Sequence, residues 1–118
     1  MGTFSYKVEI GSTDLSRFDT LEFLVDTGST YTWIPKDLVS KLGFKVTGQR
    51  RVRLADGREV LRDGVDANIR IDGEIHPNFC LIAGSGDSLL LGAITLETFS
   101  LGVDPVNKKL IPVVASAM

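Results

Sequence analysis

The stretch Phe23-Leu24-Val25-Asp26-Thr27-Gly28-Ser29-Thr30 decides how the rest of the chain is interpreted, because three apolar residues lead directly into an acid, a hydroxyl and a glycine. An ionised carboxylate buried without partners is costly or takes up a proton, so an acid directly after a core strand needs a specific environment. Gly28 permits a tight turn and close approach, and Thr27 and Ser29 supply hydroxyls that can hold the acid. The stretch predicts a held, partly buried acid at Asp26.

The same acid begins a longer run that resembles a known active site. Residues 26–35 read Asp-Thr-Gly-Ser-Thr-Tyr-Thr-Trp-Ile-Pro, which is similar to the Asp-Thr-Gly-Ser-Ser-x-x-Trp-Val-Pro run of pepsin-like aspartic proteases. Asp-Thr-Gly by itself is also compatible with an ordinary turn after a strand. The tryptophan and proline at matching spacing favour the protease motif.

A second stretch points to the same family. Leu89-Leu90-Leu91-Gly92 is followed by Ile94, Leu96 and Phe99 at helical spacing. This arrangement resembles the hydrophobic-hydrophobic-Gly motif and single helix of retroviral-type proteases, in which the strand supports the active-site loop from behind. With an Asp-Gly hairpin signal between the two motifs, the features fall in the order of that family, and the resemblance spans residues 21–113.

Length and composition describe one soluble domain over residues 1–118. The chain has 43% hydrophobic residues, 24% charged residues and a net charge of -2, which gives no general attraction to nucleic acid or anionic membrane. No apolar run approaches the roughly 18 residues of a membrane span, and the first residues do not form a charged-then-apolar leader. We therefore expect a cytoplasmic protein without membrane contact.

Single copies of cysteine and histidine limit the chemistry of the chain. Cys80 lies between Phe79 and Leu81 and predicts an inert core thiol. His76, the only histidine, has no partners for a histidine-based zinc site or a Ser-His pair and is expected in a surface turn. We expect no metal and no cofactor.

Apolar and polar residues alternate over much of the chain, which predicts a strand-rich fold. The expected strands cover residues 4–10, 21–25, 46–54, 58–71, 74–83 and 89–91, with two short strands within 103–113. Asp56-Gly57 predicts a hairpin with a type I′ turn, and Asp72-Gly73 predicts a second turn. His76-Pro77 is expected to interrupt the strand over 74–83.

Helical and loop signals are few. The run from Pro35 to Gly43 places proline at the start, Leu38 and Leu42 four residues apart and glycine at the stop, which predicts a short helix. The small-residue run over 84–88 lacks the Gly-Lys-Ser/Thr ending of a phosphate cradle and is interpreted as a loop.

The resemblance implies an all-β, closed barrel-like aspartic protease fold with a flap hairpin and one or two short helices. It implies an endopeptidase in which Asp26 activates water, with Thr27, Gly28 and Ser29 supporting the active-site loop. The hairpin tip, Ala55-Asp56-Gly57, would act as a flap over an extended polypeptide substrate. We also expect the Ser29 hydroxyl to donate to the Asp26 carboxylate.

The chain departs from the family pattern in three places. Retroviral proteases usually carry an acid two residues after the glycine and an arginine after the late glycine, where this chain has Thr30 and Ala93. Pepsin-like enzymes carry a flap tyrosine, and residues 46–71 contain none. The bracing of the subunits and of the substrate backbone must therefore differ.

A homodimer is expected from the number of acids. The mechanism of the family uses two apposed carboxyls, but the chain contains one Asp-Thr-Gly and no internal repeat. The other Asp-Gly pairs, at Asp56, Asp63 and Asp72, lack the apolar lead-in strand and the intervening hydroxyl. A two-fold axis would pair Asp26 of one chain with Asp26 of its copy.

Two other functions remain open. The domain could be a catalytically silent module of the same fold that binds peptides or dimerises. It could also be a small barrel that binds nucleic acid through hairpin arginines, although acids interleave and no aromatic residue of the hairpin offers a stacking platform. A solvated hairpin face is the preferred interpretation of these arginines, which are Arg50, Arg51, Arg53, Arg58 and Arg62.

Overall fold

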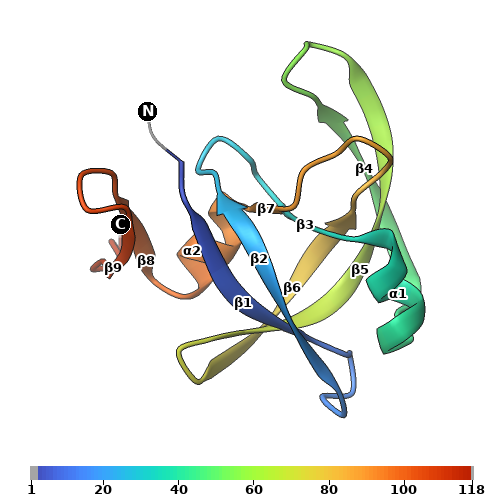
Figure 1. Cartoon of the computed structure of the whole chain (residues 1–118), viewed down its shortest axis with the longest axis horizontal. Helices are drawn as coiled ribbons and strands as arrows, with labels where there is room; N and C mark the ends of the chain where they lie inside the picture. Colours follow the sequence, from blue (N-terminus) through green and yellow to red (C-terminus); the bar gives the residue numbers. More distant parts are fainter. Residues whose placement is uncertain (1–2, 118) are drawn as a thin grey trace.

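The computed structural model describes residues 3–117, so Met1, Gly2 and Met118, the ends of the predicted 1–118 domain, lie outside the described residues. Nine strands and two short helices follow one another along the described chain (Figure 1). Their bounds are β1 Ser5–Gly11, β2 Phe18–Val25, β3 Thr32–Ile34, α1 Lys36–Leu42, β4 Val46–Arg53, β5 Glu59–Ile71, β6 Glu74–Ile82, β7 Leu90–Leu91, α2 Ala93–Thr98, β8 Leu101–Asp104 and β9 Lys109–Pro112.

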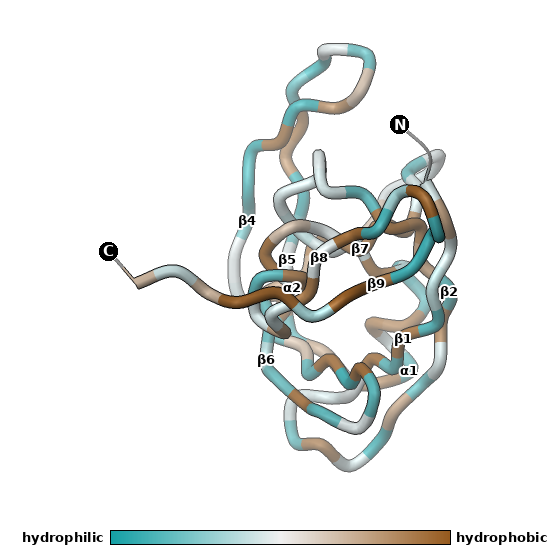
Figure 2. The backbone as a smooth tube through the Cα atoms, turned by 90° about the vertical axis from the view of Figure 1, so that its left-hand side faces the viewer, coloured by the Kyte–Doolittle hydropathy of each residue, from teal (hydrophilic) through white to brown (hydrophobic). Residues whose placement is uncertain are grey.

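A seven-stranded sheet forms most of the molecule. Its order is β3-β6-β5-β1-β2-β7, with β4 paired to β5, and it curls into a nearly closed barrel. The pairs β2–β7 and β3–β6 are parallel and the other pairs are antiparallel. Strands β8 and β9 form a separate two-stranded sheet, after which the chain leads away from the barrel (Figure 2). The predicted all-β, barrel-like fold with two short helices is confirmed.

The core contains the inward-facing residues that the alternating pattern predicted. Val8 and Ile10 of β1, Phe23 of β2 and Ile69 of β5 are at most 1% exposed and pack in one cluster. Cys80 is also fully buried there, and burial raises the pKa of its thiol to about 12. The predicted core position of Cys80 is confirmed. Within residues 3–117 no helix is long and apolar enough to cross a membrane.

Strand β2 begins three residues earlier than the sequence predicted. Phe18 pairs with Gly11 and Thr20 pairs with Glu9 in the antiparallel β1–β2 ladder. The aromatic ring of Phe18 lies so close to Gly11 that a Cβ atom there would be 2.4 Å from it. The absence of a side chain at Gly11 therefore lets the ladder continue through this point.

The two Asp-Gly turns differ in geometry. The predicted hairpin of β4 and β5 is confirmed, but only Gly57 has a positive φ, of 90°, so the type I′ prediction is wrong. The amide of Gly57 donates to Leu54 O at 2.9 Å and that of Leu54 donates to Arg58 O at 2.8 Å, as in a type I turn followed by a glycine bulge. Positive φ at both Asp72 and Gly73 gives the β5–β6 turn the type I′ signature instead.

The prediction for His76 and Pro77 is wrong. Both residues lie within an unbroken β6, paired with Ile69 and Asn68 of β5. Strand β3 pairs only with residues 80–82 of β6, so in the described chain the proline faces an open sheet edge, where a missing N–H is tolerated. The His76 ring packs edge to face on Phe99, with 4.9 Å between centroids, and is partly buried.

Candidate active site

Asp26 is the first residue after β2, and two neighbouring strands fix its position. Leu24 and Val25 pair with Leu90 and Leu91 in the parallel β2–β7 ladder. The amide of Asp26 continues this ladder by donating to Leu91 O at 3.1 Å. The strand over Leu90–Leu91 thus supports the acid loop from behind, as the resemblance implied.

The Asp26 carboxyl is partly buried and its contacts are local. Its Oδ1 atom accepts a hydrogen bond from the amide of Gly28 at 2.9 Å. The Ser29 hydroxyl instead donates to Tyr31 O at 2.8 Å and accepts from Trp33 Nε1 at 3.3 Å. The predicted bond from Ser29 to Asp26 is therefore wrong, because the backbone carbonyl and the indole already take both hydrogen-bonding roles of the hydroxyl.

Thr27, Gly28 and Ser29 form the turn that follows the acid. The amide of Ser29 donates to Asp26 O at 3.1 Å and closes this turn. Thr27 is exposed, and within residues 3–117 its hydroxyl makes no hydrogen bond to Asp26. The held carboxyl is thus oriented by the backbone of Gly28 rather than by a neighbouring hydroxyl.

Two buried threonines connect the acid loop to the late glycine. Thr32 and Thr95, each 1% exposed, share a hydrogen bond of 2.6 Å between their hydroxyls. Thr32 Oγ1 also accepts from the amide of Gly92 at 2.9 Å. Sequence reasoning missed both threonines, because nothing local relates two hydroxyls separated by 63 positions.

Backbone hydrogen bonds complete this connection. The amide of Ala93 donates to Ser29 O at 2.7 Å and the amide of Ile94 donates to Thr30 O at 3.1 Å. Thr30 and Ala93, two of the three departures from the family pattern, therefore contribute main-chain contacts at the places where retroviral proteases usually have an acid and an arginine. These main-chain hydrogen bonds hold the acid loop against the start of α2 without an acid–arginine pair.

The substitution Gly92→Ala is expected to destabilise the protein by about 3 kcal/mol, near the upper end of the usual cost of overpacking. A Cβ atom at Gly92 would lie 2.3 Å from Tyr31 O and 2.9 Å from Ser29 O, so backbone would have to move. Thermal unfolding should show a midpoint lowered by roughly 10 °C. A midpoint within a degree or two of the unmodified protein would show that the loop is not held against Gly92.

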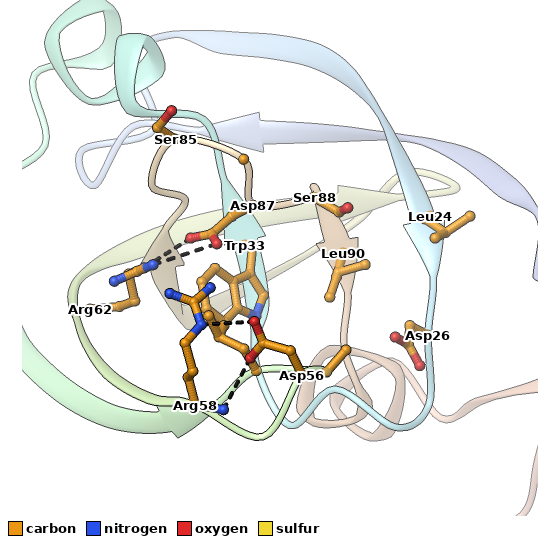
Figure 3. Close-up of a pocket in the computed structure, with 13 residues that line it drawn as sticks. Leu24, Asp26, Trp33, Asp56, Arg58, Arg62, Ser85, Asp87, Ser88 and Leu90 are labelled. Atoms are coloured by element: carbon orange, nitrogen blue, oxygen red, sulfur yellow. Dashed lines mark hydrogen bonds and ion pairs between the residues drawn. The ribbon is translucent and has the colours of Figure 1, made fainter.

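A cleft of about 550 Å³ lies beside Asp26 and is shared with the tip of the β4–β5 hairpin (Figure 3). Ala55 and Asp56, two of the three predicted tip residues, line the cleft, whereas Gly57 is not among its lining residues. The cleft also contains Leu24, Trp33, Leu54, Arg58, Arg62, Ser85, Gly86, Asp87, Ser88 and Leu90. The fold therefore brings the acid, the hairpin tip and the loop over 84–88 to one cavity.

Residues 7–95 match the family model described as aspartyl protease. The chain belongs to the aspartyl protease family. A comparison with curated protein sequences finds no match.

Solved structures of retroviral-type proteases share the fold of this aspartyl protease. The EIAV protease in complex with the inhibitor HBY-793 has a TM-score of 0.61 and 18% identity, over 83% of this chain and 88% of that one. The retroviral protease-like domain of Ddi1 from Leishmania major has a TM-score of 0.55 and 16% identity, over 90% and 86%. A retropepsin-like aspartic protease from Rickettsia conorii has a TM-score of 0.51 and 22% identity, over 88% and 89%.

One ion pair closes the end of the aspartyl protease cleft that is remote from Asp26 (Figure 3). Arg62 Nε lies 2.8 Å from Asp87 Oδ2, and the two side chains are 23% and 11% exposed. Burial acts to raise the pKa of Asp87, but hydrogen bonds from Arg62 and from the amide of Gly84 outweigh it and hold the pKa below its usual value. No local sequence signal predicted this pair, because its partners are 25 positions apart.

The hairpin arginines of this aspartyl protease are used in different ways. Arg53 pairs with Glu59 and Arg58 pairs with Asp56, both on exposed surface, as the predicted solvated face requires. Arg62 is partly buried in its pair with Asp87, so the prediction is wrong at that position.

Proposed function

We propose that this aspartyl protease is an aspartic endopeptidase that acts as a homodimer, with Asp26 as the catalytic acid of each chain. The observation that carries the proposal is that Asp26, at the end of β2, lines the same cleft as the hairpin tip. Such a cleft between an acid and a covering hairpin suits an extended peptide that lies across the acid. Thr27, Gly28 and Ser29 would support the loop, and Ala55-Asp56-Gly57 would form the tip of the flap.

The chemistry follows from two carboxyls that share one site. Two acids a few ångströms apart do not both ionise readily, so the pair holds one proton, and aspartic proteases are the standard example of this sharing. The ionised carboxyl takes a proton from water as a general base, and the protonated one donates a hydrogen bond to the scissile carbonyl. The backbone N–H of Gly28, 2.9 Å from Asp26 Oδ1, would keep the carboxyl in orientation during this exchange.

The hairpin would contribute by excluding water. Its tip places Leu54 and Ala55 beside Trp33 in the cleft, so apolar surface faces the position of a bound peptide. A covering flap strengthens electrostatic interactions in the site and completes the binding surface on closing. The role that a flap tyrosine fills in pepsin-like enzymes would fall to other groups, since residues 46–71 contain no tyrosine.

Incubation with casein between pH 3 and pH 8 tests the proposal. We expect cleavage that a statine-type peptide inhibits, because such a peptide mimics the tetrahedral transition state. Casein that is bound but not cleaved would favour the catalytically silent module. Salt-sensitive binding of single-stranded DNA without cleavage would favour the nucleic-acid barrel.

The substitution Ser29→Ala is expected to leave the acid limb of the pH–rate profile unchanged. That limb reports ionisation of the catalytic base, and the Ser29 hydroxyl bonds to Tyr31 O and the Trp33 indole rather than to Asp26. Loss of these partly buried hydrogen bonds should lower the unfolding free energy by about 1 kcal/mol. An acid limb displaced upward would show that Ser29 donates to the carboxylate in the working enzyme.

A further inference from the structure

Two arginines face each other across the β4–β5 hairpin. Arg50 of β4 and Arg62 of β5 are direct partners in the antiparallel ladder, so their side chains leave the ribbon on the same face. Like charges in such a position destabilise a strand pair. Both guanidinium groups are nevertheless fixed, because each reaches a different loop of the cleft region.

Arg50 reaches the loop that follows Asp26. Its Nε atom donates to the Tyr31 hydroxyl at 3.0 Å, and its guanidinium lies over the ring of Phe79, 4.6 Å from the centroid. The Tyr31 and Phe79 rings meet edge to face, with 5.9 Å between centroids. The backbone carbonyl of Tyr31 also accepts a hydrogen bond from the Ser29 hydroxyl. Arg50 therefore connects this strand of the hairpin to the acid loop.

Arg62 reaches the loop on the other side of the cleft. Its pair with Asp87 is largely shielded from water, unlike the exposed pair of Arg53 and Glu59, whose side chains are 71% and 45% exposed. Shielded, hydrogen-bonded pairs hold position better than solvated ones. The loop of Asp87 leads into β7, which pairs with β2 next to Asp26.

Below these two arginines the hairpin has a neck with a glycine on each strand. Gly48 lies opposite Gly64, the register shifts between Val46 and Gly48, and the Phe79 ring fills the space where side chains would stand. Within residues 3–117, β5 pairs with β6 only from Gly64 onward, so residues 49–63 form a two-stranded ribbon. Figures 1 and 2 show this ribbon projecting beyond the sheet. An isolated ribbon is marginally stable, so its position depends on what holds it.

We propose that Arg50 and Arg62 are positioning residues that hold the hairpin tip over the cleft of Asp26, one through Tyr31 and the other through Asp87. Release of either contact lets the tip move away from the acid. The consequence for catalysis rests on the proposed endopeptidase function, whereas the position of the tip does not. In an active enzyme, loss of a tether should raise KM more than it lowers kcat, because binding beneath the tip is weakened.

A fluorescent probe at the tip can measure this position. Ala55 and the only tryptophan, Trp33, line the same cleft, and the only cysteine, Cys80, is fully buried. In the variant Ala55→Cys, bimane would therefore react only with the introduced cysteine. Its fluorescence would be quenched by the nearby indole of Trp33. A Trp33→Phe version of the labelled protein gives the unquenched intensity. The measurement needs no substrate, so it gives an answer whether or not the protein cleaves peptides.

Arg50→Gln and Asp87→Asn each break one tether, and Arg53→Gln is the matched control on the same strand. We expect each tether variant to reduce bimane quenching at least twofold, with a thermal midpoint close to that of the control. Arg53→Gln should keep the original quenching. The proposal is overturned if the tether variants keep full quenching, if the control loses as much quenching, or if the labelled starting protein shows none.

Discussion

The substitution Asp26→Asn is expected to reduce peptide cleavage about 1,000-fold, since a positioned general base contributes roughly 100- to 10,000-fold to a rate. An amide cannot take a proton from water at any pH of the assay. Its oxygen can still accept the 2.9 Å hydrogen bond from the amide of Gly28, so the loop should keep its geometry. The thermal midpoint should therefore stay within a few degrees of the unmodified protein.

Asp72→Asn provides the matched control. Asp72 also precedes a glycine, but it lies in the β5–β6 turn with a φ of 51°, a conformation that asparagine adopts readily. We expect this variant to cleave casein at the unmodified rate. Cleavage by purified Asp26→Asn at more than a trace of the normal rate would rule out Asp26 as the catalytic acid.

Mixing the active chain with a ninefold excess of Asp26→Asn is expected to lower the activity per active chain about tenfold. If chains exchange freely, an active chain meets another active chain about one time in ten, and a mixed dimer holds one competent acid. Dilution should also lower the activity per chain, because the concentration of dimer falls faster than that of total chain.

The same excess of Asp72→Asn should instead raise the total activity, because its dimers with the active chain would keep both acids. Light scattering on the assay samples reports the mass of the active species. A shared site would be excluded if the activity per active chain stays the same after addition of the inactive variant and after dilution, and if the mass is that of a monomer.

The sequence predicted those parts of the fold that have local signals. The strand that leads into Asp26, the glycine after Leu91 and the hairpin at Asp56-Gly57 could be placed without coordinates, although the turn type of that hairpin was predicted wrongly. Errors arose where a local rule met tertiary context. Pro77 was expected to break a strand, but it lies where β6 has an open edge.

The position of the acid loop in the candidate site could be predicted from the sequence, but the hydrogen-bond partners of its side chains could not. Ser29 lies three residues after the acid in sequence, which suggested a hydrogen bond to Asp26, yet its hydroxyl has other partners, Tyr31 and Trp33. A hydroxyl rotates to whichever partner the packed structure offers, and sequence does not show that choice. The contact between Arg62 and Asp87 was hidden for the same reason, since any of several acids could have paired with that arginine.

The stoichiometry of a statine-type peptide tests the shared site most directly. Native mass spectrometry of the protein with a slight excess of this inhibitor counts chains and inhibitor molecules in one complex. A site built from Asp26 of two chains predicts one inhibitor for two chains, and Asp26→Asn should bind it far more weakly. One inhibitor on each single chain, or no complex with the unmodified protein, would contradict a two-fold aspartic site.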